Sequence, residues 1–204
     1  MQHGGDPFEG SSPRFIPDIR EQAIMQQGGD VEAFRRQNAA FHAQMLQTIL
    51  VNCWHKREYE SRPMWERYGR GEPAVAMVTT LQDLIMGMPE PVTVGHVEYA
   101  DLETDQRFTA NLRQRAFMKS RDLEDEREVR AVLVDGPITE NGRWRIEIKP
   151  GEEIGYRVKV DFARILQSAV LSTRHIEGVV SKCLADAHLN IPVALSTAAR
   201  EVRY

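Results

Sequence analysis

The chain has 204 residues, 42% of them hydrophobic and 27% charged, with a formal net charge of −4, which fits one globular domain over 1–204 and excludes a disordered chain. No apolar run approaches the roughly 18–20 residues that span a bilayer, and an acidic chain lacks the basic footprint of nucleic-acid binders, so neither a membrane nor a nucleic-acid partner is expected. Two cysteines cannot form a disulfide scaffold and the N-terminus lacks a secretory signal, which together favour a reduced, cytoplasmic setting.

A loop-rich segment over 1–29 comes first, because glycine and proline recur there too often for more than a short helix. Asp30 is the expected N-cap of a long helix that runs to about Leu50. The further elements expected before residue 120 are a buried strand over 51–54, a helix from Pro63 to Gly69, a strand over 74–78, a helix capped by Thr80 and Asp83, a strand over 92–99 and a helix over 106–119.

Strand patterns dominate between residues 128 and 162. Apolar residues such as Trp144 and Ile146 alternate there with charged ones, and Asn141-Gly142 is a strong hairpin signal, so we expect a three-stranded meander. A last helix carries an apolar stripe of six residues that we expect to be buried in the core: Ile176, Val179, Val180, Cys183, Leu184 and Ala187. A closing strand follows at 193–195. The predicted fold class is therefore α+β, with a mixed, mostly antiparallel sheet and flanking helices.

Aromatic side chains gather in one short window of the sequence. Trp54, Tyr59, Trp65 and Tyr68 fall within fifteen positions, accompanied by four polar or reactive residues: Cys53, His55, Glu60 and Ser61. One interpretation is a tryptophan-rich corner of the core. The other is a pocket wall that stacks on a planar ligand such as a nucleobase or nicotinamide.

A charged trio leads into an apolar strand at residues 126–134. If the strand already begins at Glu126, its period of two places Glu126, Glu128 and Arg130 on one face. Buried carboxylates need a partner, which Arg130 or Lys119 could supply. The trio is either a strand end at the solvent or a site in which one glutamate positions a polar substrate and the other tunes it.

An acidic turn and a weak metal signal complete the candidates. Asp6-Pro7-Phe8-Glu9-Gly10 sets a turn that is either a plain loop or part of a site. Cys53 and His55 offer two ligand types, but no second pair follows at zinc-ligand spacing, so no metal site is expected. The sequence also has no glycine-rich phosphate loop and no serine nucleophile elbow.

Taken in order, these motifs resemble the bacterial domain-of-unknown-function 2971 family. The stretches that carry the resemblance are Asp6 to Gly10, Val51 to Trp54, Glu60-Ser61, Met64-Trp65, Tyr68, Lys119 and Glu126-x-Glu128-x-Arg130. The resemblance covers nearly the whole chain, from Asp6 to about Ser196. Family members usually have a further segment before the acidic turn, so the likeness implies an N-terminally short member.

The acidic motif is also similar to that of ADP-ribosyltransferases, with Thr79-Thr80 in the place of their Ser-Thr-Ser motif, whose literal form is missing. This likeness implies that Glu128 is the catalytic carboxylate, that Glu126 is its partner, and that NAD is the substrate. A glutamate of that kind stabilises an oxocarbenium-like centre at the ribose. The candidate binding residues for such a nucleotide ligand are Trp54, Glu60, Ser61, Trp65, Tyr68, Lys119, Arg130, Asp6 and Glu9.

Two other functions compete with an NAD-consuming transferase. One is a non-catalytic interaction or regulatory domain, in which the motif residues support the core and its rim. The other is a magnesium-dependent nuclease that uses Glu126, Glu128 and Asp6, which the acidic net charge disfavours.

Overall fold

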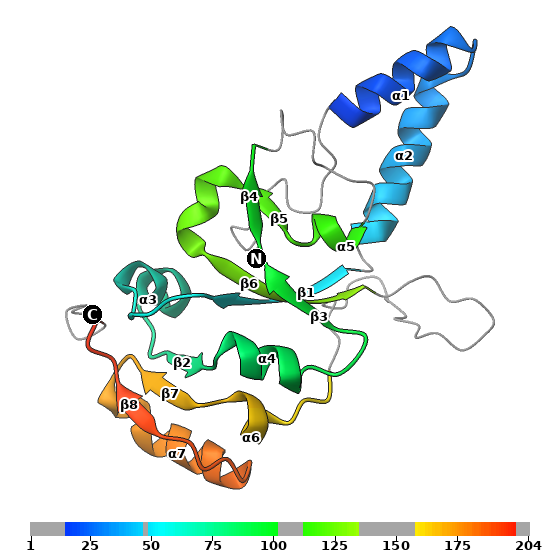
Figure 1. Ribbon diagram of the computed structural model, residues 1–204. Helices are drawn as coiled ribbons and strands as arrows, with labels where there is room; N and C mark the ends of the chain where they lie inside the picture. The colour runs from blue at the N-terminus through cyan, green and yellow to red at the C-terminus, as the bar shows by residue number, and fades with distance from the viewer. Residues whose placement is uncertain (1–14, 47–48, 102–111, 135–157, 199–204) are drawn as a thin grey trace. The chain divides into compact units, whose positions relative to one another are not determined.

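The structure is a computed structural model that describes residues 15–46, 49–101, 112–134 and 158–198 (Figure 1). Helices and short strands form an α+β fold whose sheets are mostly antiparallel, as predicted. The chain divides into two compact units, which comprise 1–56 with 90–157, and 57–89 with 158–204. The expected single domain over 1–204 stays a prediction. Among the described residues, no helix has the length and apolar character needed to cross a membrane.

The first unit begins with a pair of helices, α1 (Phe15–Gln26) and α2 (Val31–Leu46). Asp30 caps α2 as predicted, because its Oδ1 accepts a hydrogen bond from the Ala33 N–H at 2.9 Å. The segment over 1–29 is less loop-rich than expected, since α1 occupies twelve of its described residues. The acidic turn at residues 6–10 lies outside the described part of the chain.

A three-stranded antiparallel sheet forms the centre of the first unit. Its order is β1 (Ile49–His55), β6 (Glu128–Val134) and β3 (Thr93–His96), so β6 has a neighbour on both sides. The predicted strand over 51–54 is present, but the prediction that it is buried is wrong. It lies at the edge of the sheet as far as the described strands go, and Val51 keeps 43% of its surface while Cys53 is also exposed.

The strand expected over 92–99 is broken at Val97. Its second half is β4 (Glu98–Ala100), which pairs in parallel with β5 (Met118–Ser120), while Val97 itself donates to the Glu128 carbonyl at 3.0 Å. Of the predicted helix over 106–119, the structure describes residues 112–119. Among these, only α5 (Leu112–Arg115) is helical. Lys119 therefore lies in a strand and not in a helix. Most of the meander expected after β6 falls in residues 135–157, which are outside the described part.

The second unit contains a sheet of order β2-β7-β8, with β2 and β7 antiparallel and β7 and β8 parallel. Its elements are α3 (Arg62–Gly69), β2 (Val75–Val78), α4 (Leu81–Gly87), α6 (Phe162–Ile165), β7 (Ser168–Leu171), the 3-10 turn η2 (Arg174–Ile176), α7 (Glu177–Asp186) and β8 (Val193–Leu195). The predicted cap of α4 is confirmed, because the Asp83 N–H donates to the Thr80 hydroxyl at 3.0 Å.

The last helix is present as predicted, but its apolar stripe is not buried along its length. Leu184 is buried at 8% exposure, whereas Val179 is 66% exposed and Cys183 is also exposed. A ten-residue helix over a small sheet buries only the side chains that face that sheet. The prediction that Cys183 belongs to the core is therefore wrong.

Candidate functional site

Four charged side chains converge inside the first unit, and we call them the charge cluster. They are Lys119 in β5, Glu126 at the end of the 3-10 helix η1 (Arg121–Glu126), and Glu128 and Arg130 in β6. Their residues are exposed by only 6%, 5%, 3% and 0%, respectively. All four were predicted site residues, and the structure brings them together in the core and not at a solvent-facing strand end.

The route by which Glu126 reaches the cluster differs from the predicted one. Glu126 ends η1 and precedes Arg127, whose φ of 48° is left-handed, and β6 begins only at Glu128. The strand therefore does not start at Glu126, and strand alternation does not align the first glutamate. A tight turn at Arg127 instead brings both carboxylates to one lysine.

Short ion pairs connect the members of the cluster. Lys119 Nζ donates to Glu126 Oε2 at 2.6 Å and to Glu128 Oε1 at 2.9 Å. Arg130 Nε donates to the other oxygen of Glu128, Oε2, at 2.7 Å, and its Nη1 donates to the Ala116 carbonyl at 2.7 Å. Two cations thus face two carboxylates, which is the pairing that buried charges require.

Burial and ion pairing have opposite effects on the pKa values of the cluster. Burial raises the pKa of Glu128, but the Arg130 charge and the Lys119 hydrogen bond outweigh it, so the pKa lies below its usual value. Burial lowers the pKa of Lys119, but its bonds to Glu126 and Glu128 outweigh that effect and raise it. Both groups are therefore ionised near neutral pH.

Neighbouring strands hold the backbone of the cluster in place. The Glu128 N–H donates to the Tyr99 hydroxyl at 2.7 Å, and His55 Nδ1 lies 2.9 Å from the Glu126 carbonyl, to which it donates. Burial raises the pKa of Tyr99, which keeps the phenol protonated. Sequence analysis missed the role of Tyr99, because nothing in its local pattern marks a partner 29 residues away.

Gly95 faces the cluster across the sheet and makes room for the ring of Phe117. It lies opposite Arg130 in the β3–β6 register. A Cβ atom at Gly95 would lie 3.2 Å from a carbon of the Phe117 ring, so this ring packs directly on the glycine. The long Arg130 side chain therefore lies beside a position that has no side chain of its own.

A second polar cluster lies in the second unit and is built around Glu60. Its Oε2 accepts hydrogen bonds from the Ser196 hydroxyl and from Trp65 Nε1, the latter at 3.2 Å. Its Oε1 accepts from the backbone N–H and the hydroxyl of Thr197, at 3.2 and 3.4 Å. Burial opposes ionisation of Glu60, but the Ser196 hydroxyl and the other donors hold its pKa below the usual value.

The four aromatic residues do not form a common buried corner. Trp54 belongs to the first unit, and its Nε1 donates to Asn52 Oδ1 at 2.5 Å. Tyr59 and Tyr68 are 83% and 58% exposed, and Trp65 is half-buried beside Glu60. Ser61 takes the N-cap position of α3 without a side-chain capping bond. The predicted aromatic wall stays a prediction; among these four residues, Trp65 contacts Glu60.

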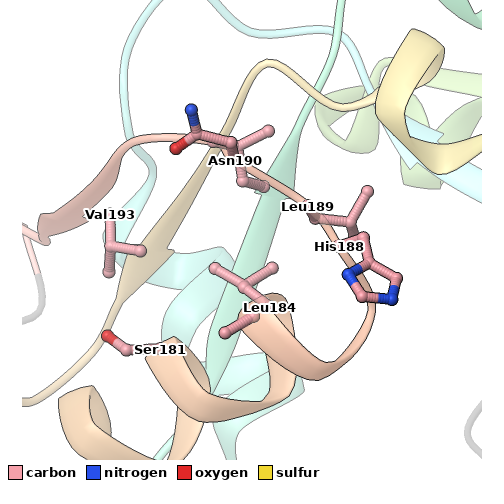
Figure 2. Close-up of a pocket in the computed structure, with 8 residues that line it drawn as sticks. Ser181, Leu184, His188, Leu189, Asn190 and Val193 are labelled. Carbon is pink, nitrogen blue, oxygen red and sulfur yellow. The ribbon is translucent and has the colours of Figure 1, made fainter.

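An open groove of about 490 Å³ lies between the end of α7 and β8 (Figure 2). Its lining is Ser181, Leu184, Ala185, His188, Leu189, Asn190, Ile191 and Val193. None of the predicted site residues contributes to it. The groove is mostly apolar and belongs to the second unit alone.

The described residues contain no group of three or more histidine, cysteine, aspartate or glutamate side chains that could hold a metal ion. Asp6, the third carboxylate of the nuclease hypothesis, and Glu9 lie outside those residues. The chain matches no protein-family model, no curated protein and no solved structure.

Proposed function

We propose that this chain is a non-catalytic interaction or regulatory domain of the bacterial domain-of-unknown-function 2971 family, in which the charge cluster is a structural part of the core. The observation that supports this proposal is that the carboxylate of Glu128 is already bound by groups inside the protein. Both of its carboxylate oxygens accept hydrogen bonds from buried cations, and the residue is 3% exposed. A carboxylate that acts on a substrate must come within hydrogen-bond reach of it.

Access to Glu128 would require an internal partner to leave. A ligand that displaced Lys119 or Arg130 would leave a buried charge without its counter-charge, which costs about 3–5 kcal/mol. The geometry therefore favours a role for the cluster in fixing β5, η1 and β6 against one another. The interaction surface of such a domain lies elsewhere on the molecule.

An NAD-dependent transferase, or an inactive relative of one, is the second candidate, and one observation favours it. The two glutamates of the acidic motif lie together, because Lys119 Nζ is 2.6 Å from Glu126 Oε2 and 2.9 Å from Glu128 Oε1. An ionised carboxylate can stabilise an oxocarbenium-like centre. In this case Glu128 is the catalytic carboxylate and Glu126 its partner. Trp54, which belongs to the same unit, stacks on nicotinamide, and Lys119 or Arg130 holds a phosphate.

The substitution Glu128→Gln separates the two proposals. A structural cluster predicts a loss of about 3–5 kcal/mol in the free energy of unfolding, because two buried cations then share one carboxylate. A catalytic glutamate predicts a nearly unchanged melting temperature together with loss of NAD turnover. Glu124→Gln is the matched control, since Glu124 is an exposed carboxylate of η1.

A thermal shift titration with NAD tests the second candidate directly. Ligand at a hundred times its dissociation constant adds about 2.7 kcal/mol of stability, a rise of several degrees for a chain of this size. A saturable rise in the wild-type chain and in Glu124→Gln, combined with turnover that Glu128→Gln abolishes, would overturn the non-catalytic proposal. A flat titration would overturn the transferase instead.

A further inference from the structure

The Glu60 cluster has the composition of an anion receptor. Five donors converge on this one carboxylate: the hydroxyls of Ser196 and Thr197, the backbone N–H groups of Thr197 and Ala198, and the indole N–H of Trp65. Consecutive backbone N–H groups supported by hydroxyls are a recurrent way in which proteins bind carboxylates. Five donors fill the roughly four lone-pair sites of a carboxylate with protein groups.

The two sides of this cluster differ in how firmly they are held. The donors at 196–198 directly follow β8, and the Ser196 N–H is bonded to the Leu171 carbonyl at 2.8 Å, with Ser196 fully buried. Glu60 is an exposed residue in the irregular segment between β1 and α3. The receptor is therefore anchored on a sheet, while the group that occupies it belongs to a loop.

We propose that Ser196, Thr197 and Ala198 form a binding site for a carboxylate ligand, whose place Glu60 occupies in this conformation. All five donors are neutral groups that already hold a carboxylate, so a second carboxylate fits the same geometry. An external carboxylate binds when the Glu60 loop leaves, so Glu60 acts as an internal competitor. This site shares no residue with the charge cluster and does not depend on the role assigned to that cluster.

The substitution Glu60→Ala gives a direct test, because it removes the atoms that acetate supplies. We expect the melting temperature of this variant to rise by about 3–6 °C once acetate reaches ten times its dissociation constant. The wild-type chain should not respond, since Glu60 competes. Glu58→Ala is the matched control, because Glu58 is an exposed carboxylate of the same loop.

Titrations with other compounds test which chemical group the site binds. Acetamide, which has the shape of acetate without its charge, and sodium chloride at equal ionic strength should give no rise. Inorganic phosphate should act more weakly than acetate. In the Glu60→Ala background, Thr197→Val should weaken acetate binding by about 2–10-fold, the effect of one lost hydrogen bond.

Three results would overturn the proposal: no saturable effect of acetate on Glu60→Ala, an equal effect on Glu58→Ala, or an equal effect of acetamide. If Glu60→Ala does not fold in buffer alone, acetate is titrated onto the unfolded chain and circular dichroism is recorded. Recovery of the native spectrum then supports the site, and its absence overturns it.

Discussion

The phenol oxygen of Tyr99 accepts a hydrogen bond from the backbone N–H of Glu128 at 2.7 Å, which ties β4 to the first residue of the buried strand β6. Removal of the hydroxyl in Tyr99→Phe would leave this N–H without an acceptor inside the protein. We expect the free energy of unfolding to fall by about 1–3 kcal/mol, measured by urea denaturation. Tyr59→Phe, at a tyrosine that is 83% exposed, should change it by less than about 0.5 kcal/mol. Equal effects of the two substitutions would show that the bond contributes nothing.

Acid should destabilise the protein through Glu128. Its pKa in the folded state lies below the ordinary value of 4.5, because Arg130 and Lys119 outweigh the effect of burial. The stability that this carboxylate provides is present above pH 4.5 and is lost as the pH falls through its folded pKa. Urea midpoints between pH 7 and pH 3 should therefore decrease below about pH 4.5. Glu124→Gln should keep this dependence, and Glu128→Gln should reduce it.

Lys119 is expected to make the stability of the protein fall at high pH. Its pKa is raised above the ordinary 10.5, so its contribution is present below pH 10.5 and is lost as the pH rises through the folded pKa. Urea midpoints that stayed constant both below pH 4.5 and above pH 10.5 would contradict the charge cluster as described.

Gly87 is expected to tolerate no side chain. A Cβ atom there would lie 2.1 Å from Cγ1 and 2.7 Å from Cδ1 of Ile165, which is buried in α6. Gly87→Ala should cost about 1–3 kcal/mol of stability through overpacking. In Gly87→Ala/Ile165→Ala the loss should be smaller than the sum of the single losses, because the shortened side chain makes room. Gly178→Ala is the control: nothing lies within 4 Å of that position, and a small gain is expected.

His188 occupies a backbone conformation that favours glycine. Its φ is 55°, and it follows α7 in the arrangement where the Leu189 N–H bonds to the Leu184 carbonyl at 2.8 Å. His188→Gly should raise the free energy of unfolding by about 0.5–1 kcal/mol, measured by urea denaturation. His175→Gly, in the turn η2, should lower it. A loss of stability in His188→Gly would mean that the imidazole makes contacts that outweigh the backbone strain.

Local signals in the sequence predicted local structure well. The caps formed by Asp30 and Thr80 depend on atoms within three residues of one another, and both are present. The helix that ends at Gly69 and the strand that begins at Val193 also lie where the sequence pattern predicted them. Such features need no knowledge of the rest of the chain.

Burial was harder to predict, because it depends on which strands and helices become neighbours. Cys53 lies next to an apolar run and Cys183 on an apolar helical stripe, yet both are exposed, one in an outer strand of the described sheet and the other on a helix. The charge cluster was predicted from strand alternation, although a left-handed residue at Arg127 is what places Glu126 in it. Ser196 was missed as a partner of Glu60, since 136 residues separate them.

The order of strands in the first sheet has a consequence for biosynthesis. β6 lies between β1 and β3, and both neighbours precede it in the chain, with Ile49 opposite Val134 and Thr93 opposite Val132. Among the described strands, β1 and β3 each pair only with β6, so neither of these pairings can form before β6 has been translated. Closure of these long loops delays the sheet. The backbone groups and apolar side chains of β1 therefore stay without their β6 partner on the nascent chain, where a chaperone or a second chain has the first opportunity to bind them.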